Sequence, residues 1–443
     1  MASADSDRQA LQQDGPAGQR ARPGACEVVG AAETCVDLAP ADGLERGGQA
    51  ASHAQLDGQP GRCGEETANY PLGCDFDHNG CAGIPVHLRL LYREGAVFLA
   101  RALAATRAAI DRDDANSYLP FQGHRALREA ACGHVAAATG RSYDPGTQCV
   151  SVAGGLNGIL NVLLATVEPG QEVVICDPVY AGLVNRIRLA GGVPRFVSCT
   201  PGPGGWATDP GELAAAIGPR TSAVLLMSPV MPTGAVLGSE HFDAIAGPVS
   251  RHRAWVIWDA AMERIRFDGQ PPIHPGAHPG LVDRTITVGS ASKELRMIGW
   301  RVGWVAGPEE VMADVGLVGL TNVVCQVGIA QQAVAAALNH PESGVDVAAA
   351  TRVWQQRCEV VLDQLAGYPC VRPHGGWSLL IDTHSMGLAP GEVSRRLFTR
   401  AQVAATPMDG WGPSGSQYLR LVFANEPAER LTDLRARFDT ALS

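Results

Sequence analysis

GSASKELRMIGWRVG, which spans Gly289–Gly303, is the most informative stretch of this 443-residue chain. It follows a β-rich run and contains a single lysine, Lys293. The amine of a lysine can form an imine with an aldehyde. The hydroxyl groups of Ser290 and Ser292 and the guanidinium of Arg301 can bind a phosphate dianion. The stretch therefore predicts a site in which an aldehyde meets Lys293 and a phosphate group lies nearby.

Short β-rich runs alternate with helical stretches on both sides of this segment. The expected strands are Gln148–Val152, Glu172–Cys176, Pro194–Ser198, Ala223–Met227, Trp255–Trp258, Thr285–Val288 and Gly303–Ala306. The expected helices between them are Leu156–Thr166, Ala181–Leu189, Pro210–Ile217 and His241–His252. This alternation is typical of βαβ units and predicts an α/β fold with a mainly parallel seven-stranded sheet flanked by helices. In such sheets the ligand binds at the carboxyl ends of the strands.

The ends of the chain have different patterns. After Val323 we expect one long helix from Cys325 past Ala348 to Leu365, and then a second, smaller α+β domain. Its expected elements are strands around Trp377–Asp382 and Tyr418–Phe423 and a closing helix, Glu426–Leu442. Helical spacing of apolar residues over Val86–Ala109 predicts a further long helix. The expected organisation is a flexible extension (1–60), an N-terminal segment that joins the small domain (61–110), a large domain (111–325) and a small C-terminal domain (326–443).

Composition excludes several classes of partner. The net charge is −10, and acidic and basic residues are interspersed, whereas nucleic acids and anionic membranes require a clustered basic patch. No run approaches the ~18 consecutive apolar residues that span a bilayer, and no apolar segment follows Met1. We therefore expect a cytoplasmic protein. The twelve cysteines are expected to be reduced thiols, and no spacing of Cys and His predicts a metal site.

Further motifs accompany the lysine segment. They are Asn69–Gly73 (NYPLG), Asn116–Gly123 (NSYLPFQG), Ala153–Gly158 (AGGLNG), Asp177–Tyr180 (DPVY), Trp258–Asp259 and Gln417–Leu421 (QYLRL). In order and spacing these motifs resemble those of the class I/II aminotransferases, a family of pyridoxal-phosphate (PLP) enzymes of fold type I whose relatives include aminocyclopropane-carboxylate synthases. The resemblance extends from about Asn69 to the C-terminus.

The resemblance implies a role for each matching residue. Lys293 would form the Schiff base to PLP, Asp259 would pair with the protonated pyridine nitrogen, and Tyr180 would stack on the ring; these three would be the catalytic residues. The phosphate would be held by Gly154, Gly155, Leu156, Ser290, Ser292 and Arg301 of one subunit and by Tyr118 of the other subunit of a homodimer. Arg420 would clamp the α-carboxylate of an amino-acid substrate, and the loop at Gly73 would lie over that substrate. The reaction would pass through external aldimine and quinonoid intermediates.

Two positions depart from the motifs of the family. Met231 stands where the family usually has an asparagine that donates to the 3′ oxygen of the cofactor, and Met262 replaces a tyrosine that donates to the same oxygen. Methionine cannot donate a hydrogen bond. If no other residue supplies a donor, the imine of the cofactor should hold its proton more tightly and its pKa should rise.

Four hypotheses follow for the function. The first is an aminotransferase, in which Lys293 shuttles the proton. The second is a PLP-dependent lyase or replacement enzyme acting at Cβ or Cγ, with a substrate such as S-adenosylmethionine. The others are a PLP-binding regulator or inactive relative, which the composition of residues 1–60 disfavours, and a metal-dependent enzyme, which the scattered histidines disfavour. Trp300, Trp377 and Trp411 could line the pocket, although core packing is the commoner use of tryptophan.

Overall fold

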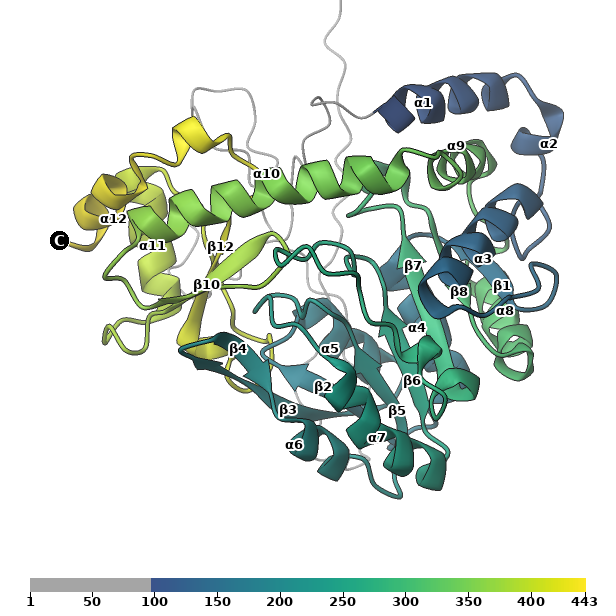
Figure 1. Cartoon of the computed structure of the whole chain (residues 1–443), viewed down its shortest axis with the longest axis horizontal. Helices are drawn as coiled ribbons and strands as arrows, with labels where there is room; N and C mark the ends of the chain where they lie inside the picture. Colours follow the sequence, from purple (N-terminus) through teal and green to yellow (C-terminus); the bar gives the residue numbers. More distant parts are fainter. Residues whose placement is uncertain (1–96) are drawn as a thin grey trace, which may run out of the picture. The chain divides into compact units, whose positions relative to one another are not determined.

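The computed structural model describes residues 97–443 and contains two β-sheets (Figure 1). The strands of the larger sheet are β1 (Cys149–Val152), β2 (Glu172–Asp177), β3 (Val193–Gly202), β4 (Gly205–Thr208), β5 (Thr221–Leu226), β6 (Trp255–Asp259), β7 (Thr285–Ser290) and β8 (Gly303–Ala306). Their spatial order is β1-β8-β7-β6-β5-β2-β3-β4. Strands β7, β6, β5, β2 and β3 are parallel, while β8 is antiparallel to both of its neighbours. Strand β1 therefore runs in the same direction as β7.

Helices cover both faces of the larger sheet. The helices are α1 (Val97–Ile110), α2 (Asp113–Asn116), α3 (Arg125–Thr139), α4 (Gly155–Thr166), α5 (Ala181–Leu189), α6 (Pro210–Ala215), α7 (Ser239–His252), α8 (Glu309–Val323), α9 (Gly328–Leu338), α10 (Ser343–Gln364), α11 (Pro390–Ala401) and α12 (Leu434–Leu442). Val173 and Ile175 of β2 pack with α4, α5 and α8, whereas Val174 and Cys176 pack with α6 and α7. Alternate side chains of a strand point to opposite faces, so a strand covered on both sides is apolar throughout.

The smaller sheet has the order β11-β12-β10-β9 and is antiparallel. Its strands are β9 (Cys370–Val371), β10 (Ser378–Asp382), β11 (Thr406–Pro407) and β12 (Tyr418–Val422). They share a core with α10, α11 and α12, in which Trp354, Leu397 and Phe438 are fully buried. Figure 1 shows the long helix α10 extending from α9 toward α11 and α12.

The predicted α/β class and the seven predicted strands are confirmed, and the sheet has one strand more. Strand β4 returns antiparallel to β3 after a turn that includes Gly204, and its four residues are too few to show a period in the sequence. The single helix expected from Cys325 to Leu365 is wrong, because α9 ends at Leu338 and α10 starts at Ser343. Pro341 lies in the gap; it lacks a backbone N–H and disfavours helical geometry at the residue before it.

Other predictions are tested only in part. Of the helix expected over Val86–Ala109, the described portion is α1. The 1–60 extension and Gly73 lie outside the described residues, and the domain boundaries and the cytoplasmic location stay predictions. Within residues 97–443 no helix is long and apolar enough to span a membrane, and no cluster of three His, Cys, Asp or Glu side chains could hold a metal ion.

Candidate active site

The carboxyl ends of the parallel strands bring most of the predicted site residues to one edge of the larger sheet. Gly154 follows β1, Tyr180 follows β2, Asp259 ends β6 and Ser290 ends β7. Because these strands run in the same direction, their last residues meet at the same edge. The fold thus gathers residues that are more than 130 positions apart in the sequence.

One group of polar atoms surrounds the first turn of α4. The guanidinium of Arg301 donates to the Ser292 hydroxyl at 3.3 Å and to the Ala153 carbonyl at 3.3 Å. The Ser290 hydroxyl accepts from the Ser292 N–H at 3.2 Å. The first N–H groups of a helix have no acceptor within it, and the helix dipole favours an anion at this end. We name the group formed by Gly154, Gly155, Leu156, Ser290, Ser292 and Arg301 the anion cradle.

Small residues are required where the cradle is most crowded. Gly154 has φ +86°, and a Cβ there would collide with the guanidinium of Arg301. A Cβ on Gly303 would lie 2.7 Å from the Gly289 carbonyl oxygen and 3.0 Å from the Gly155 nitrogen. The AGGLNG and GSASK motifs therefore approach each other through backbone, which leaves their N–H and hydroxyl groups for a ligand. A phosphate group suits this combination of helix N-terminus, hydroxyls and guanidinium.

Lys293 lies beside the cradle and is partly buried. Its Nζ lies 4.6 Å from the ring centroid of Trp377. Burial, and then the positive charges of Arg420 and Arg301, lower the pKa of Lys293 to about 8, while Asp259 acts in the opposite direction. A lysine with a lowered pKa is more often uncharged near neutral pH, and the uncharged amine is the nucleophile.

Asp259 is buried at the end of β6. Its Oδ1 accepts a hydrogen bond from the Ala261 N–H at 3.1 Å. Burial raises the pKa of Asp259 to about 6, although this hydrogen bond and the charge of Lys293 lower it. A buried carboxylate with this environment is suited to a cationic partner, such as a protonated ring nitrogen.

Arg420 on β12 is also buried. Its Nε donates to the Ser378 hydroxyl at 3.0 Å, and its guanidinium lies 5.5 Å from the ring centroid of Trp411. Burial lowers the pKa of Arg420 to about 10. Its Nη2 atom has no hydrogen-bond partner within residues 97–443. A buried, charged donor without a partner is costly, so Arg420 is prepared to bind an anion such as a carboxylate.

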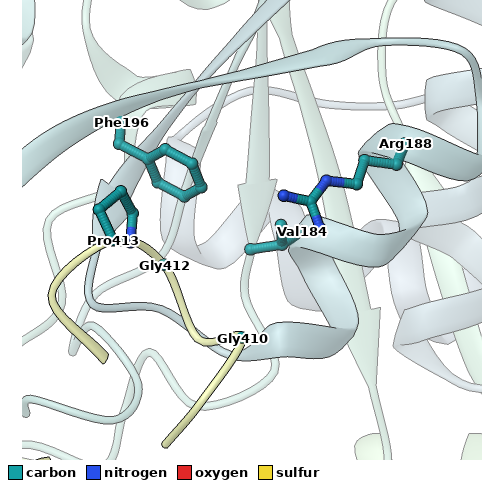
Figure 2. A pocket seen from close by; sticks show the side chains of 6 residues that line it. All are labelled: Val184, Arg188, Phe196, Gly410, Gly412 and Pro413. Atoms are coloured by element: carbon teal, nitrogen blue, oxygen red, sulfur yellow. The ribbon is translucent and has the colours of Figure 1, made fainter. Parts of the chain in front are cut away.

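Tyr180 and Trp411 form an aromatic pair that borders Arg420. Their ring centroids are 5.3 Å apart in an edge-to-face arrangement. The loop that carries Trp411 is tied to β2, because the Val179 N–H donates to the Trp411 carbonyl at 2.9 Å and the Ser414 N–H donates to Asp177. A cavity of about 230 Å³ adjoins this loop and is lined by Val184, Arg188, Phe196, Gly410, Gly412 and Pro413 (Figure 2). None of the predicted site residues lines that cavity.

One predicted residue, Tyr118, is not brought to this group within the chain. The Tyr118 side chain is 87% exposed on the surface of the chain. Gly73 lies outside the described residues. Two tryptophans, in contrast, belong to the site although their spacing gave no sign of it: Trp377 contacts Lys293 and Trp411 contacts Arg420. The neighbouring glycines, Gly375–Gly376, were the available signal for a close approach of backbone.

The two methionines that depart from the motifs lie in neighbouring loops. Met262 is buried, and its Cε would be 3.1 Å from a Cβ on Gly376. Met231 is partly buried, and its N–H points to the sulfur of Met227 at 3.2 Å. The loop of Met231 packs on the same segment, since a Cβ on Gly375 would collide with Pro229. Met262 belongs to the same apolar cluster as Trp377, and Met231 packs against that cluster.

Comparison with known proteins agrees with this geometry. The family model for class I and II aminotransferases matches residues 90–438. An arginine–pyruvate transaminase of Pseudomonas aeruginosa is 31% identical over 79% of this chain and 92% of its own length. An aspartate/prephenate aminotransferase of Thermus thermophilus is 33% identical over 73% of this chain and 83% of its own length. The crystal structure of an aromatic aminotransferase from Pyrococcus horikoshii superposes with a TM-score of 0.73 at 29% identity, covering 77% of this chain and 91% of that one.

These matches identify the class of protein. The fold is that of the PLP-dependent transferases of fold type I. The chain belongs to the class I and II aminotransferases, and its activity is of the aminotransferase type.

Proposed function

We propose that this chain binds PLP and transfers the amino group of an α-amino acid to a 2-oxo acid. The observation that carries the proposal is the arrangement of Lys293, Asp259 and Arg420 around an anion cradle at one edge of the sheet. Arg301, Ser290, Ser292 and the first turn of α4 would hold the phosphate group. When bound, the cofactor supplies an aldehyde for the substrate amine and a ring that accepts the electron pair left by loss of a proton.

The side chains of the chain itself have distinct tasks in this proposal. Arg420 binds the α-carboxylate with its unpaired Nη2 and so orients the substrate. Burial lowers the pKa of the Lys293 amine to about 8. This amine would take the proton from the α carbon of the substrate and return it to the former aldehyde carbon of the cofactor. Asp259 would pair with a protonated nitrogen of the cofactor ring, and Tyr180 would stack on that ring.

A spectroscopic screen tests the proposal. The purified protein with PLP is mixed singly with arginine, aspartate, phenylalanine and S-adenosylmethionine, and the visible spectrum is followed. We expect a reactive amino acid to convert the cofactor to pyridoxamine phosphate and to leave the corresponding 2-oxo acid. Release of a leaving group from the substrate, with the cofactor still in the aldehyde form, would instead indicate elimination or replacement.

A homodimer with shared sites is the second part of the proposal. Exposed apolar side chains lie on neighbouring elements: Tyr118, Phe121, Leu317, Val323, Val324 and Val327. Phe121 lies against α8 near Gly316, and α2 packs on α9, so these side chains form one patch. Val324 in this patch has φ +67°, a strained conformation for a β-branched residue. Burial of the patch against a second copy would account for its apolar character.

Hybrid dimers test whether Tyr118 acts on the partner's site. Tyr118→Phe should weaken cofactor retention, and Lys293→Ala should remove catalysis. If Tyr118 acts in trans, the hybrid has one site with both defects and one site with neither; if it acts in cis, each site has one defect. At limiting PLP, a mixture that is more active than the average of its two components supports action in trans, and a mixture no more active than that average contradicts it.

A further inference from the structure

Trp377 is an unassigned residue next to the reacting amine. The side chain is 4% exposed, and the Lys293 Nζ lies 4.6 Å from its ring centroid. Its indole N–H has no hydrogen-bond acceptor within residues 97–443. Buried N–H groups are nearly always paired, so an unpaired one beside a site is explained by an acceptor that a ligand supplies.

The position of Trp377, rather than the unpaired state alone, supports this explanation. The indole N–H groups of Trp206, Trp304 and Trp354 are also buried without an acceptor in the described part of the chain. Those rings do not contact Lys293; Trp354, for example, lies on α10 within the core of the smaller sheet. Trp377 alone among these four has a reactive cation over its ring.

Trp377 also lies where the other donors are missing. It directly follows Gly376, which packs against the Met262 side chain, and precedes Ser378, which accepts from Arg420. The side chains of Met262 and Met231 have no group that can donate a hydrogen bond. The Trp377 N–H is a buried donor next to Lys293, and the Arg420 Nη2 is another whose positive charge acts on Lys293; neither has an acceptor within residues 97–443.

We propose that the Trp377 indole N–H donates a hydrogen bond to an anionic oxygen that a bound molecule brings beside Lys293. The proposal rests on the proposed function, and the oxygen belongs either to the ring of the cofactor or to the carboxylate of the amino acid. In the first case Trp377 takes the place of the donors lost at Met231 and Met262, and in the second it orients the substrate together with Arg420. A phenyl ring of similar packing could not take this part, because it has no N–H to donate.

Trp377→Phe tests the proposal because phenylalanine keeps an aromatic ring over Lys293 and removes the N–H. Trp354→Phe is the matched control, because it removes an equally buried and unpaired indole N–H from the same hydrophobic cluster. Both variants are prepared as holoenzymes. Two quantities are measured: the pH at which the visible absorption of the bound cofactor titrates, and the dissociation constant of propionate, a carboxylate that cannot react.

The two measurements distinguish the sources of the oxygen. If the N–H binds the ring oxygen, Trp377→Phe moves the absorption titration upward by about one pH unit, since the imine then holds its proton more tightly. If it binds the carboxylate, the dissociation constant of propionate rises about tenfold, as expected for loss of a hydrogen bond to a charged acceptor. A Trp377→His variant, which keeps a ring N–H, is expected to lie between wild type and Trp377→Phe.

Other results would overturn the proposal. Trp377→Phe with both quantities unchanged, or changed no more than in Trp354→Phe, would show that the indole only packs. Failure of the cofactor binding on which the proposal rests is recognised separately, because the wild-type chain would then show no absorption of a bound cofactor.

Discussion

The two ends of the candidate site are built from different materials. At the anion cradle, polar groups come from tight turns and a helix terminus, and Gly154 and Gly303 allow the backbones to approach. At the other end, which we call the amine end, the Lys293 Nζ lies over the Trp377 ring. The loops that pack with Trp377 there carry Met231 and Met262. The predicted departures from the motifs of the family, Met231 and Met262, adjoin the amine end and not the cradle.

The difference separates what holds a cofactor from what tunes it. A phosphate group needs several N–H and hydroxyl donors at fixed positions, so the residues that build such a cradle tolerate little change. The groups around a reacting amine set its pKa and the fate of its proton, and these can vary while the fold and the ligand stay the same. We therefore expect changes at the cradle to affect cofactor binding, and changes at the amine end to affect the reaction.

Removal of the amine should have the largest effect. Lys293→Ala is expected to lower turnover by about 10³-fold or more, because the group that moves the proton is lost. The loss is measured as the rate of 2-oxo acid formation by the variant with PLP added. Because the cradle is intact, the variant should still bind PLP noncovalently. Full turnover by this variant would refute the assignment of the site.

A change at the cradle should mainly weaken cofactor binding. Gly154→Ala places a Cβ against Arg301 in a left-handed conformation, and we expect the dissociation constant of PLP to rise about tenfold or more. Equilibrium dialysis measures this constant. Gly140→Ala is the matched control, because Gly140 also has a positive φ but has open space around it. Equal weakening in both variants would mean that backbone strain, and not the cradle, is responsible.

A change at Arg420 should affect the substrate rather than the cofactor. Arg420→Lys keeps the charge but loses the planar fork, and we expect kcat/KM to fall about tenfold while PLP binding is unchanged. Steady-state kinetics with the amino acid identified in the screen measure this. Arg430→Lys, at an exposed ion pair with Glu426, serves as the control and should behave as wild type. An unchanged kcat/KM in Arg420→Lys would contradict the proposal that Arg420 binds the α-carboxylate of the substrate.

The pH dependence of imine formation should give the smallest effect. Burial disfavours the charged form of Lys293 and lowers its pKa to about 8, so the amine is largely uncharged above that pH. In the cofactor-free protein, the rate of imine formation with added PLP should rise up to about pH 8 and change about twofold from pH 8 to 10. Stopped-flow absorption follows the reaction. A rate that keeps rising to pH 10 would show an ordinary, solvated lysine.

Much of the fold and many of the site residues could be predicted from the sequence. The order of strands and helices between residues 148 and 306 follows from the alternation of apolar runs, and the motifs that end those strands are brought to the same edge of the sheet. Local chemistry was less visible. The sequence around Trp377 and Trp411 does not distinguish a tryptophan in a site from one in a core. The fold places their rings beside Lys293 and Arg420, respectively. The break before α10 depends on a single proline within an otherwise helical pattern.

The fate of the substrate nitrogen tests the central claim most directly. The holoenzyme is incubated with ¹⁵N-labelled amino acid and unlabelled pyruvate, and the products are identified by mass spectrometry. We predict ¹⁵N-alanine together with an equal amount of the 2-oxo acid of the donor. Release of ¹⁵N-ammonia, with no label in alanine, would contradict amino-group transfer and indicate a lyase.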